Sequence, residues 1–242
     1  MQEFSLEELT GRVRSHVVEV EDPRCTLHRA VVAPFLALRA AASEAGMELA
    51  PTSTFRDFSQ QLRIWNDKFR GARPLLDQDS RPLDPRAMSA EQIVDAILRW
   101  SALPGASRHH WGTEIDVIDR KALREGQRPQ LVPAAFAAGG AFARLGTWLS
   151  QHCEQYGFYR PYDVDRGGVL PEPWHLSYAP ISSRALAQLT LDALARTLSS
   201  AAIDGAAVIN ARLPEIYQRY VLAVAPPGMA ALAGINPAAR PS

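Results

Sequence analysis

The side chains best suited to chemistry lie in two short stretches of this sequence. SRHHWGTEID contains His109 and Asp116, and PEPWHLSY contains Glu172 and His175. Imidazole nitrogens and carboxylate oxygens are ligands that zinc binds in a tetrahedron, with bonds near ~2 Å. Each of these residues alone would suit a polar loop or a satisfied core position. Together, the two stretches predict a metal site.

The spacing of the first pair requires a turn in the chain. His109 and Asp116 are seven residues apart. On a helix this spacing separates them by ~10 Å along the axis, and on a flat strand it turns them to opposite faces. The two side chains therefore reach one ion only if the backbone turns between them. Gly112 suits that turn because glycine tolerates a positive φ.

The second stretch supplies the other groups that a catalytic site needs. Glu172 and His175 are three residues apart, and Pro173 between them discourages a regular strand ladder. His175 would complete three protein ligands and leave a fourth position for water, as in catalytic rather than structural zinc sites. Glu172 would then act as general base on water whose pKa the metal lowers to roughly 7.

The elements that must position these residues are predicted to mix helices and strands. Helical spacing indicates helices over 25–46, 57–69 and 142–156, and a capping box of Ser89 and Gln92 indicates another. Alternating or short apolar runs predict strands in ELAPTSTFR, TEIDVID, GFYRPY and WHLSY. The chain is therefore expected to be α+β up to about residue 181.

The character of the chain changes after that point. SRALAQLTLDALARTLSSA and LPEIYQRYVLAV are predicted to be helical, the first with an apolar leucine face. We expect a domain over residues 1–181 and a helical appendage over 182–242 that packs on it, with a dimer contact as the alternative. The tail after about 225 is expected to be frayed.

Bulk properties exclude several classes of function. The 242 residues are 47% hydrophobic, and 26 basic residues balance 26 acidic ones. Without a basic excess we expect no nucleic-acid partner, and no apolar run is long enough to predict a membrane span. The N-terminus does not resemble a secretory signal, and Cys25 and Cys153 suit free thiols in a reducing compartment. We expect a cytoplasmic location, or a periplasmic one if a leader had been trimmed.

The motifs resemble those of a known enzyme family. The pattern Ser-x-His-x-x-Gly-x-x-x-Asp from Ser107 to Asp116, followed by Glu-Pro-Trp-His ending at His175, resembles the D-alanyl-D-alanine carboxypeptidase and dipeptidase family. That family includes the vancomycin-resistance peptidases and is similar in structure to the hedgehog signalling domain. Arg56 and Gln61, five residues apart, match a third family element. The resemblance implies a small antiparallel sheet flanked by helices.

The resemblance, which covers roughly residues 25–181, also implies a role for each site residue. One zinc ion per chain would be held by His109, Asp116 and His175. Glu172 would be the general base. Arg56 would stabilise the oxyanion or the substrate carbonyl; the alternative is that it pairs with Asp57 or with a helix end.

Four further residues carry open alternatives. Ser107 and Gln61 would help to position the substrate, but a loop hydroxyl and a solvated helix residue would have the same sequence signature. His110 competes with its neighbour as ligand, although only His109 has the family's offset from the glycine and the aspartate. Glu114 stands where the family usually has alanine, which adds an acid near the site.

The resemblance implies a zinc metallopeptidase that removes the C-terminal D-alanine from peptidoglycan stem peptides. Its partners would be peptidoglycan-derived peptides or muropeptides, and the bond cut would be D,D or L,D. If the enzyme is cytoplasmic, recycled tetrapeptides would favour L,D cleavage. The alternatives are a D-Ala-D-Ala dipeptidase, a cross-bridge endopeptidase, or a retired zinc-containing binding module. The sequence leaves the oligomeric state open.

Overall fold

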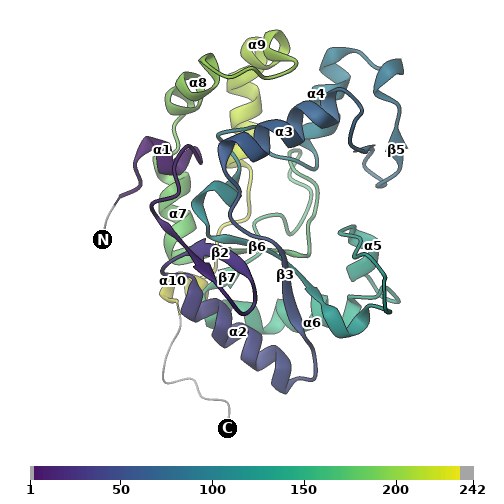
Figure 1. The fold of residues 1–242 in the computed structure, drawn as a ribbon, viewed down its shortest axis with the longest axis vertical. Helices are drawn as coiled ribbons and strands as arrows, with labels where there is room; N and C mark the ends of the chain where they lie inside the picture. The colour runs from purple at the N-terminus through teal and green to yellow at the C-terminus, as the bar shows by residue number, and fades with distance from the viewer. Residues whose placement is uncertain (1–2, 235–242) are drawn as a thin grey trace.

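Four antiparallel strands form the sheet at the centre of the molecule (Figure 1). The computed structural model describes residues 3–234. The strands lie in the order β3 (Leu49–Ser53), β6 (Glu114–Asp119), β8 (His175–Tyr178) and β7 (Phe158–Tyr159). The register pairs Asp116 with His175. The α+β class and the small antiparallel sheet are therefore as predicted.

Helices α2 (Val32–Glu44) and α6 (Ala143–His152) pack against the sheet in the lower part of Figure 1. They share one buried hydrophobic cluster with the strands, whose members include Phe35, Leu38, Ile115, Val117, Leu145, Leu149 and Leu176. Side chains alternate along a strand. Because Ile115 and Val117 belong to this cluster, Glu114 and Asp116 face the opposite side of β6, where the candidate site lies.

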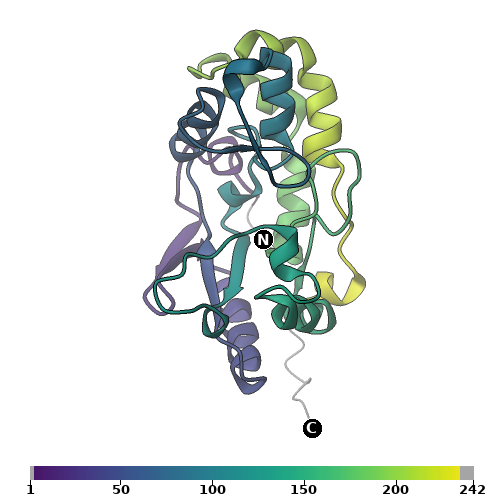
Figure 2. The same cartoon turned by 90° about the vertical axis from the view of Figure 1, so that its right-hand side faces the viewer.

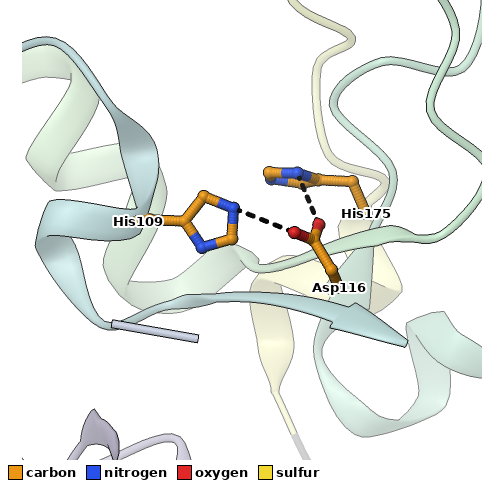
Figure 3. A group of neighbouring side chains, drawn as sticks. All are labelled: His109, Asp116 and His175. Carbon is orange, nitrogen blue, oxygen red and sulfur yellow. Dashed lines mark ion pairs between the residues drawn. The ribbon is translucent and has the colours of Figure 1, made fainter. Parts of the chain in front are cut away.

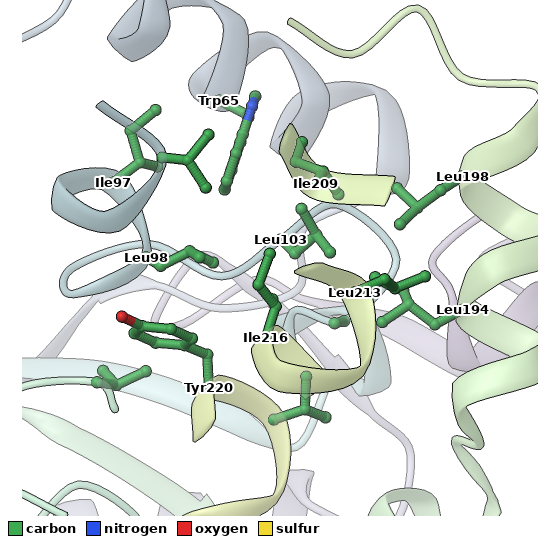
Figure 4. Packing of buried hydrophobic residues seen from close by; sticks show 14 of the residues in the cluster. Trp65, Ile97, Leu98, Leu103, Leu194, Leu198, Ile209, Leu213, Ile216 and Tyr220 are labelled. Atoms are coloured by element: carbon green, nitrogen blue, oxygen red, sulfur yellow. The ribbon is translucent and has the colours of Figure 1, made fainter. Parts of the chain in front are cut away.

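A second cluster lies between helices from both halves of the chain, at the top of Figures 1 and 2, and Figure 4 shows its packing from close by. These helices are α3 (Phe58–Phe69), α4 (Ala90–Leu98), α8 (Leu191–Ser199) and α9 (Ala206–Ile216). Trp65 of α3, Ile97 of α4, Leu194 of α8 and Ile209 of α9 are all fully buried. The C-terminal helices thus complete a core that begins with α3 and α4.

The remaining elements are short. They are α1 (Leu6–Leu9), β1 (Val17–Val20), β2 (Cys25–His28), β4 (Leu75–Leu76), β5 (Pro82–Leu83), η1 (Pro85–Ala87), η2 (Arg108–Trp111), η3 (Arg120–Ala122), α5 (Pro133–Phe136), η4 (Cys153–Tyr156), α7 (Ala179–Gln188), the π-helical turn η5 (Tyr217–Leu222) and α10 (Met229–Ala233). The predicted capping box is present at α4, where Ser89 and Gln92 each bond the other's backbone N–H.

The helix predicted over 25–46 is only partly right. Residues Cys25–His28 form β2, which pairs with β1 as an antiparallel hairpin, and α2 begins at Val32. Alanine and leucine further along favoured one long helix, but the strand pairing outweighs that local preference over the first four residues. Pro34 lies in the first turn of α2, where a missing N–H removes no helical hydrogen bond.

The end of the chain differs in detail from the expectation. Helix α7 runs across the expected boundary at 181, so no loop marks it, and the division into two domains stays a prediction. Within the tail that was expected to be frayed, Met229–Ala233 form α10, and Ala231 is fully buried. The rest of the expected frayed tail, 235–242, lies outside the described residues. Within residues 3–234, every helix is too short or too polar to cross a membrane.

Candidate metal centre and cleft

The structure brings three side chains from two distant segments together (Figure 3). His109 lies in η2, Asp116 in the middle of β6, and His175 at the start of β8. One ligand atom from each lies within 4.8 Å of the others, and all three residues are buried. Strand pairing brings Asp116 and His175 together, because the register sets them directly opposite each other.

The turn at Gly112 brings His109 to the other two residues. Its backbone is left-handed, with φ +67°, and it ends η2 just before β6 begins. A Cβ at this position would lie 2.5 Å from Val17 Cγ1 and 2.7 Å from the backbone nitrogen of His28. Glycine therefore meets two requirements at once, an unusual φ and close approach of the β1–β2 hairpin.

Each imidazole has one nitrogen occupied and the other turned toward Asp116. His109 donates from Nδ1 to the carbonyl of Thr54 at 2.7 Å, and its Nε2 lies 3.4 Å from Asp116 Oδ2. His175 donates from Nε2 to Glu114 Oε2 at 2.7 Å, and its Nδ1 lies 3.2 Å from Asp116 Oδ1. In the neutral rings, the nitrogens facing Asp116 carry lone pairs.

This donor set fits a metal ion. Two nitrogen lone pairs and a carboxylate converge in a buried space, and Asp116 Oδ1 is a buried oxygen with no hydrogen-bond partner. In the metal-free protein only a proton can relieve this repulsion. Burial opposes charge on both groups, yet the three carboxylates around its ring raise the pKa of His175 well above its usual value, and the two histidines lower that of Asp116. A divalent cation would take the place of that proton.

His110 is excluded as a ligand by its hydrogen bonds. Its Nδ1 donates to the carbonyl of Arg56 at 2.6 Å, and its Nε2 accepts from the N–H of Gly105 at 3.1 Å. Both nitrogens are therefore used, and the ring is neutral. Burial lowers the pKa of His110 to about 3. His110 ties two loops together, while His109 faces the site.

Glu172 lies beside the ligand set. Its Oε2 is 3.2 Å from His175 Nδ1, and its side chain is almost fully buried. The backbone N–H of His175 donates to the carbonyl of Glu172 at 3.0 Å, which closes a turn around Pro173. That turn gives both side chains of the Glu-x-x-His stretch a common direction, as the sequence predicted.

A cleft opens onto the ligands, and Arg56 and Ser107 both line it. Arg56 donates from Nη2 to Ser53 Oγ at 3.0 Å and from Nη1 to Gln61 Oε1 at 2.6 Å. Burial lowers the pKa of Arg56, although Asp116 and Glu172 oppose that shift.

The expected substrate contact of Gln61 needs correction. Gln61 is completely buried, and its amide is held on both sides, by Arg56 and by the carbonyl of Ala102 at 2.7 Å. Because the side chain has no exposed surface and does not line the cleft, it does not reach a ligand there. Gln61 thus orients Arg56, and its effect on a substrate passes through the guanidinium.

Sequence reasoning missed two polar residues of this region. Lys68 lines the cleft and donates to Ser101 Oγ at 2.6 Å. It lies seven residues after Gln61 on α3, which is the helical spacing of a shared face. Arg108 forms a buried ion pair with Glu114, with Nε 3.3 Å from Oε2. The sequence indicated Glu114 as an additional acid near the site, but it gave no sign that Arg108 would be its partner.

Comparison with known proteins identifies the family. The sequence profile of VanY D-alanyl-D-alanine carboxypeptidases matches residues 24–181. The chain belongs to this family. As a D-alanyl-D-alanine carboxypeptidase family member, it is a zinc metallopeptidase of peptidoglycan metabolism, and His109, Asp116 and His175 form its candidate metal site.

Two relatives show how much of the chain is similar in sequence to other proteins. An uncharacterised protein of Haemophilus influenzae is 34% identical over 122 residues, which are 50% of this chain and 93% of that protein. A second uncharacterised protein of Haemophilus influenzae is 41% identical over 100 residues, 40% of this chain and 68% of that protein.

Two solved structures share the fold of this carboxypeptidase family member. One is a mutant of the vancomycin-resistance D,D-pentapeptidase VanY in complex with Zn(II), with 20% identity and a TM-score of 0.50 over 69% of this chain and 80% of that one. The other is VanY of the VanB type with D-alanine-D-alanine, with 20% identity and a TM-score of 0.50 over 75% and 88%.

Proposed function

We propose that this protein is a zinc-dependent carboxypeptidase that removes the C-terminal D-alanine from peptidoglycan stem peptides. The observation that carries the proposal is the convergence of His109, Asp116 and His175 with the carboxylate of Glu172 in one cleft. Three protein ligands and an adjacent base are the composition of a catalytic zinc site rather than a structural one. The vancomycin-resistance relatives that bind Zn(II) and D-alanine-D-alanine support the same substrate class.

The residues divide the hydrolytic chemistry among them. When bound, zinc supplies Lewis acidity, which polarises a carbonyl oxygen and makes water easier to deprotonate. Glu172 accepts the proton of the attacking water and then passes it to the leaving amine nitrogen of D-alanine. Arg56 donates to the substrate carbonyl oxygen as that oxygen gains negative charge. Ser107, at the wall of the cleft, orients the peptide.

The second cation in the cleft favours a carboxypeptidase over a cross-bridge endopeptidase. Lys68 lines the same cleft as Glu172 and His175, and among residues 3–234 its ammonium group donates a hydrogen bond to Ser101 alone. An enzyme that removes one terminal residue must recognise a free carboxylate beside the scissile bond. We infer that Lys68 binds that carboxylate, whereas an endopeptidase substrate has none at this position.

The decisive experiment is mass spectrometry of a defined muropeptide mixture digested with and without a chelator. We expect chelator-sensitive loss of one alanine. Loss from pentapeptides only would mean a D,D bond, and loss from tetrapeptides an L,D bond. Hydrolysis of added free D-Ala-D-Ala with the stem peptides left intact, or opening of cross-linked dimers, would replace the proposal with a dipeptidase or an endopeptidase.

Glu172→Gln separates catalysis from metal binding. The amide keeps the size of the side chain but cannot accept a proton, so we expect bound zinc to be retained and kcat to fall by about 10²–10⁴-fold. Glu154→Gln, a change at an exposed acid on η4, is the matched control and should retain full activity. Metal content by mass spectrometry and alanine release give the two readouts. A wild-type protein as inert as the variant would point instead to a zinc-containing binding module.

A further inference from the structure

Glu114 is a buried acid that the chemistry above does not use. It begins β6 two residues before the ligand Asp116, so both side chains face the same side of the strand. Its side chain is completely buried. A buried carboxylate without partners is strongly destabilising. The partners of Glu114 therefore indicate what the residue does.

One partner is the metal ligand His175. Glu114 Oε2 accepts a hydrogen bond from His175 Nε2 at 2.7 Å. On the other side of the ring, Nδ1 lies 3.2 Å from Asp116 Oδ1 and 3.2 Å from Glu172 Oε2. An ionised carboxylate only accepts hydrogen bonds. The proton of the neutral ring is therefore held on Nε2, and the Nδ1 lone pair is kept for the ligand set.

We propose that Glu114 is a positioning residue, which fixes the tautomer and the orientation of His175 so that Nδ1 faces the metal ion. The inference rests on the zinc site of the proposed function. Histidine ligands commonly donate their second N–H to a carboxylate or a carbonyl, which orients the ring and raises its basicity. In this chain the two ligands differ, because His109 donates to a neutral backbone carbonyl at Thr54 and His175 donates to a charged acid.

The surroundings hold Glu114 in one orientation. Oε1 accepts from Thr113 Oγ1 at 2.9 Å and from Ser177 Oγ at 2.8 Å, and Oε2 faces Arg108 Nε at 3.3 Å. Arg108 in turn donates from Nη2 to Tyr159 Oη at 2.9 Å and to Ser177 Oγ at 2.7 Å. The acid is thus fixed by its own donors and cannot rotate away from His175.

Stability alone does not explain this buried ion pair. Replacing a buried pair by apolar groups of similar volume is often neutral or stabilising. Arg108 Nη1 is, moreover, a buried nitrogen with no hydrogen-bond partner in the described structure. The ion pair thus leaves one of its own donors without a hydrogen bond, whereas the donors to Glu114 hold its carboxylate against His175.

The test is the zinc dissociation constant of variants, measured by competition with a chelator at fixed pH. Removal of a carboxylate that supports a metal ligand typically weakens metal binding by about 10–100-fold. We expect that loss in the double variant Arg108→Met, Glu114→Leu, which removes the contact with His175 without leaving an unpaired buried charge. Glu114→Gln keeps an acceptor oxygen near Nε2, so it should bind zinc more tightly than the double variant and less tightly than wild type.

Asp119→Asn is the matched control, because Asp119 is a buried acid on the same strand that bonds the N–H groups of Glu48 and Lys121. Its zinc affinity should equal that of wild type. Nitrogen chemical shifts of His175 in the zinc-loaded protein add a second readout, and they should report the proton on Nε2 in wild type. Thermal unfolding of each metal-free variant shows whether it folds, and if the double variant does not, Glu114→Gln decides the test by itself.

Two failures are distinguishable. If the folded variants bind zinc within threefold of wild type, or if the shifts place the proton on Nδ1, the role of Glu114 is wrong and the zinc peptidase remains. If wild type itself binds no zinc, the proposed function fails first.

Discussion

At the scale of single residues, hydrogen bonds to the second ring nitrogen decide what each histidine does. His109 and His110 are adjacent in sequence and identical in chemistry. His109 has its Nδ1 bonded to the carbonyl of Thr54, which leaves Nε2 facing Asp116. His110 has both nitrogens bonded within the protein. One neighbour is therefore a candidate ligand, and the other links the loops around Arg56 and Gly105.

Lys68 carries a prediction at this scale. Burial lowers the pKa of Lys68 to about 8, so its positive charge is present below that pH and is lost as the pH rises through it. We expect Lys68→Met to raise KM for stem peptides by about 10-fold with little change in kcat, because the variant loses one charged hydrogen bond to the substrate carboxylate. In wild type, KM should rise above pH ~8.

Steady-state kinetics from pH 6.5 to 9 would check both effects. Lys121→Met, a change at an exposed lysine after β6, is the matched control and should leave KM unaltered. An unchanged KM in Lys68→Met would remove this residue from substrate recognition.

At the scale of elements, the turn between η2 and β6 brings the first ligand to the other two. Replacement of Gly112 by alanine adds a Cβ that would meet Val17 and the backbone of His28 at less than 3 Å, and φ is +67°. We expect a loss of at least about 3 kcal/mol in the free energy of unfolding, and weaker zinc binding, because the strain of a left-handed alanine adds to the clash.

Gly126 separates these two contributions. It also has a positive φ, +72°, but nothing lies within 4 Å of the Cβ position. Gly126→Ala should therefore cost only the conformational strain, about 1–2 kcal/mol, and leave zinc affinity intact. Urea unfolding of the two variants makes the comparison. Equal losses would show that close approach of the hairpin does not matter.

At the scale of the whole molecule, the C-terminal helices share a core with the helices above the site. Leu194 of α8 is fully buried against this cluster. We expect Leu194→Ala to lower the free energy of unfolding by about 2–5 kcal/mol, within a single transition that also reports the loss of zinc. Leu232→Ala, at a 47% exposed position of α10, should change it by less than about 0.5 kcal/mol. Two separate transitions would instead support an independent appendage.

Acid sensitivity is a second property of the whole molecule. Burial lowers the pKa of His110 to about 3 and, with His16 and Arg29 nearby, that of His28 to about 4. Between pH ~6.5 and 4 these two histidines bind protons in the unfolded chain but not in the folded chain. Their contribution to stability is therefore full above pH ~6.5 and falls as the pH drops through this window.

Melting temperatures of the metal-free protein at pH 7.5, 5.5 and 4.5 would show this fall. In wild type, His28 Nδ1 accepts a hydrogen bond from the N–H of Ala30 at 3.1 Å. The variant His28→Asn keeps an acceptor for this N–H and removes one titrating group. Its melting temperature should depend less on pH. A flat profile in wild type would contradict the buried neutral state of both histidines.

The sequence by itself determined the ligand types, the need for a turn at Gly112 and the base beside His175, because these depend on chemistry and on spacing along one short segment. It also predicted the strands and capped helices near the site, where local preference and tertiary packing agree. It did not reveal the β1–β2 hairpin, whose strands are stabilised by pairing with each other rather than by local preference. Cellular location stays a prediction.

Only the tertiary structure decided which nitrogens face the metal, because that choice depends on partners far away in the chain. Thr54 orients His109, and Glu114 orients His175 across 61 residues. The same holds for Gln61, whose burial beneath Arg56 depends on the loop at Ala102. Spacing fixes which groups can meet, and packing fixes how each one is turned when they do.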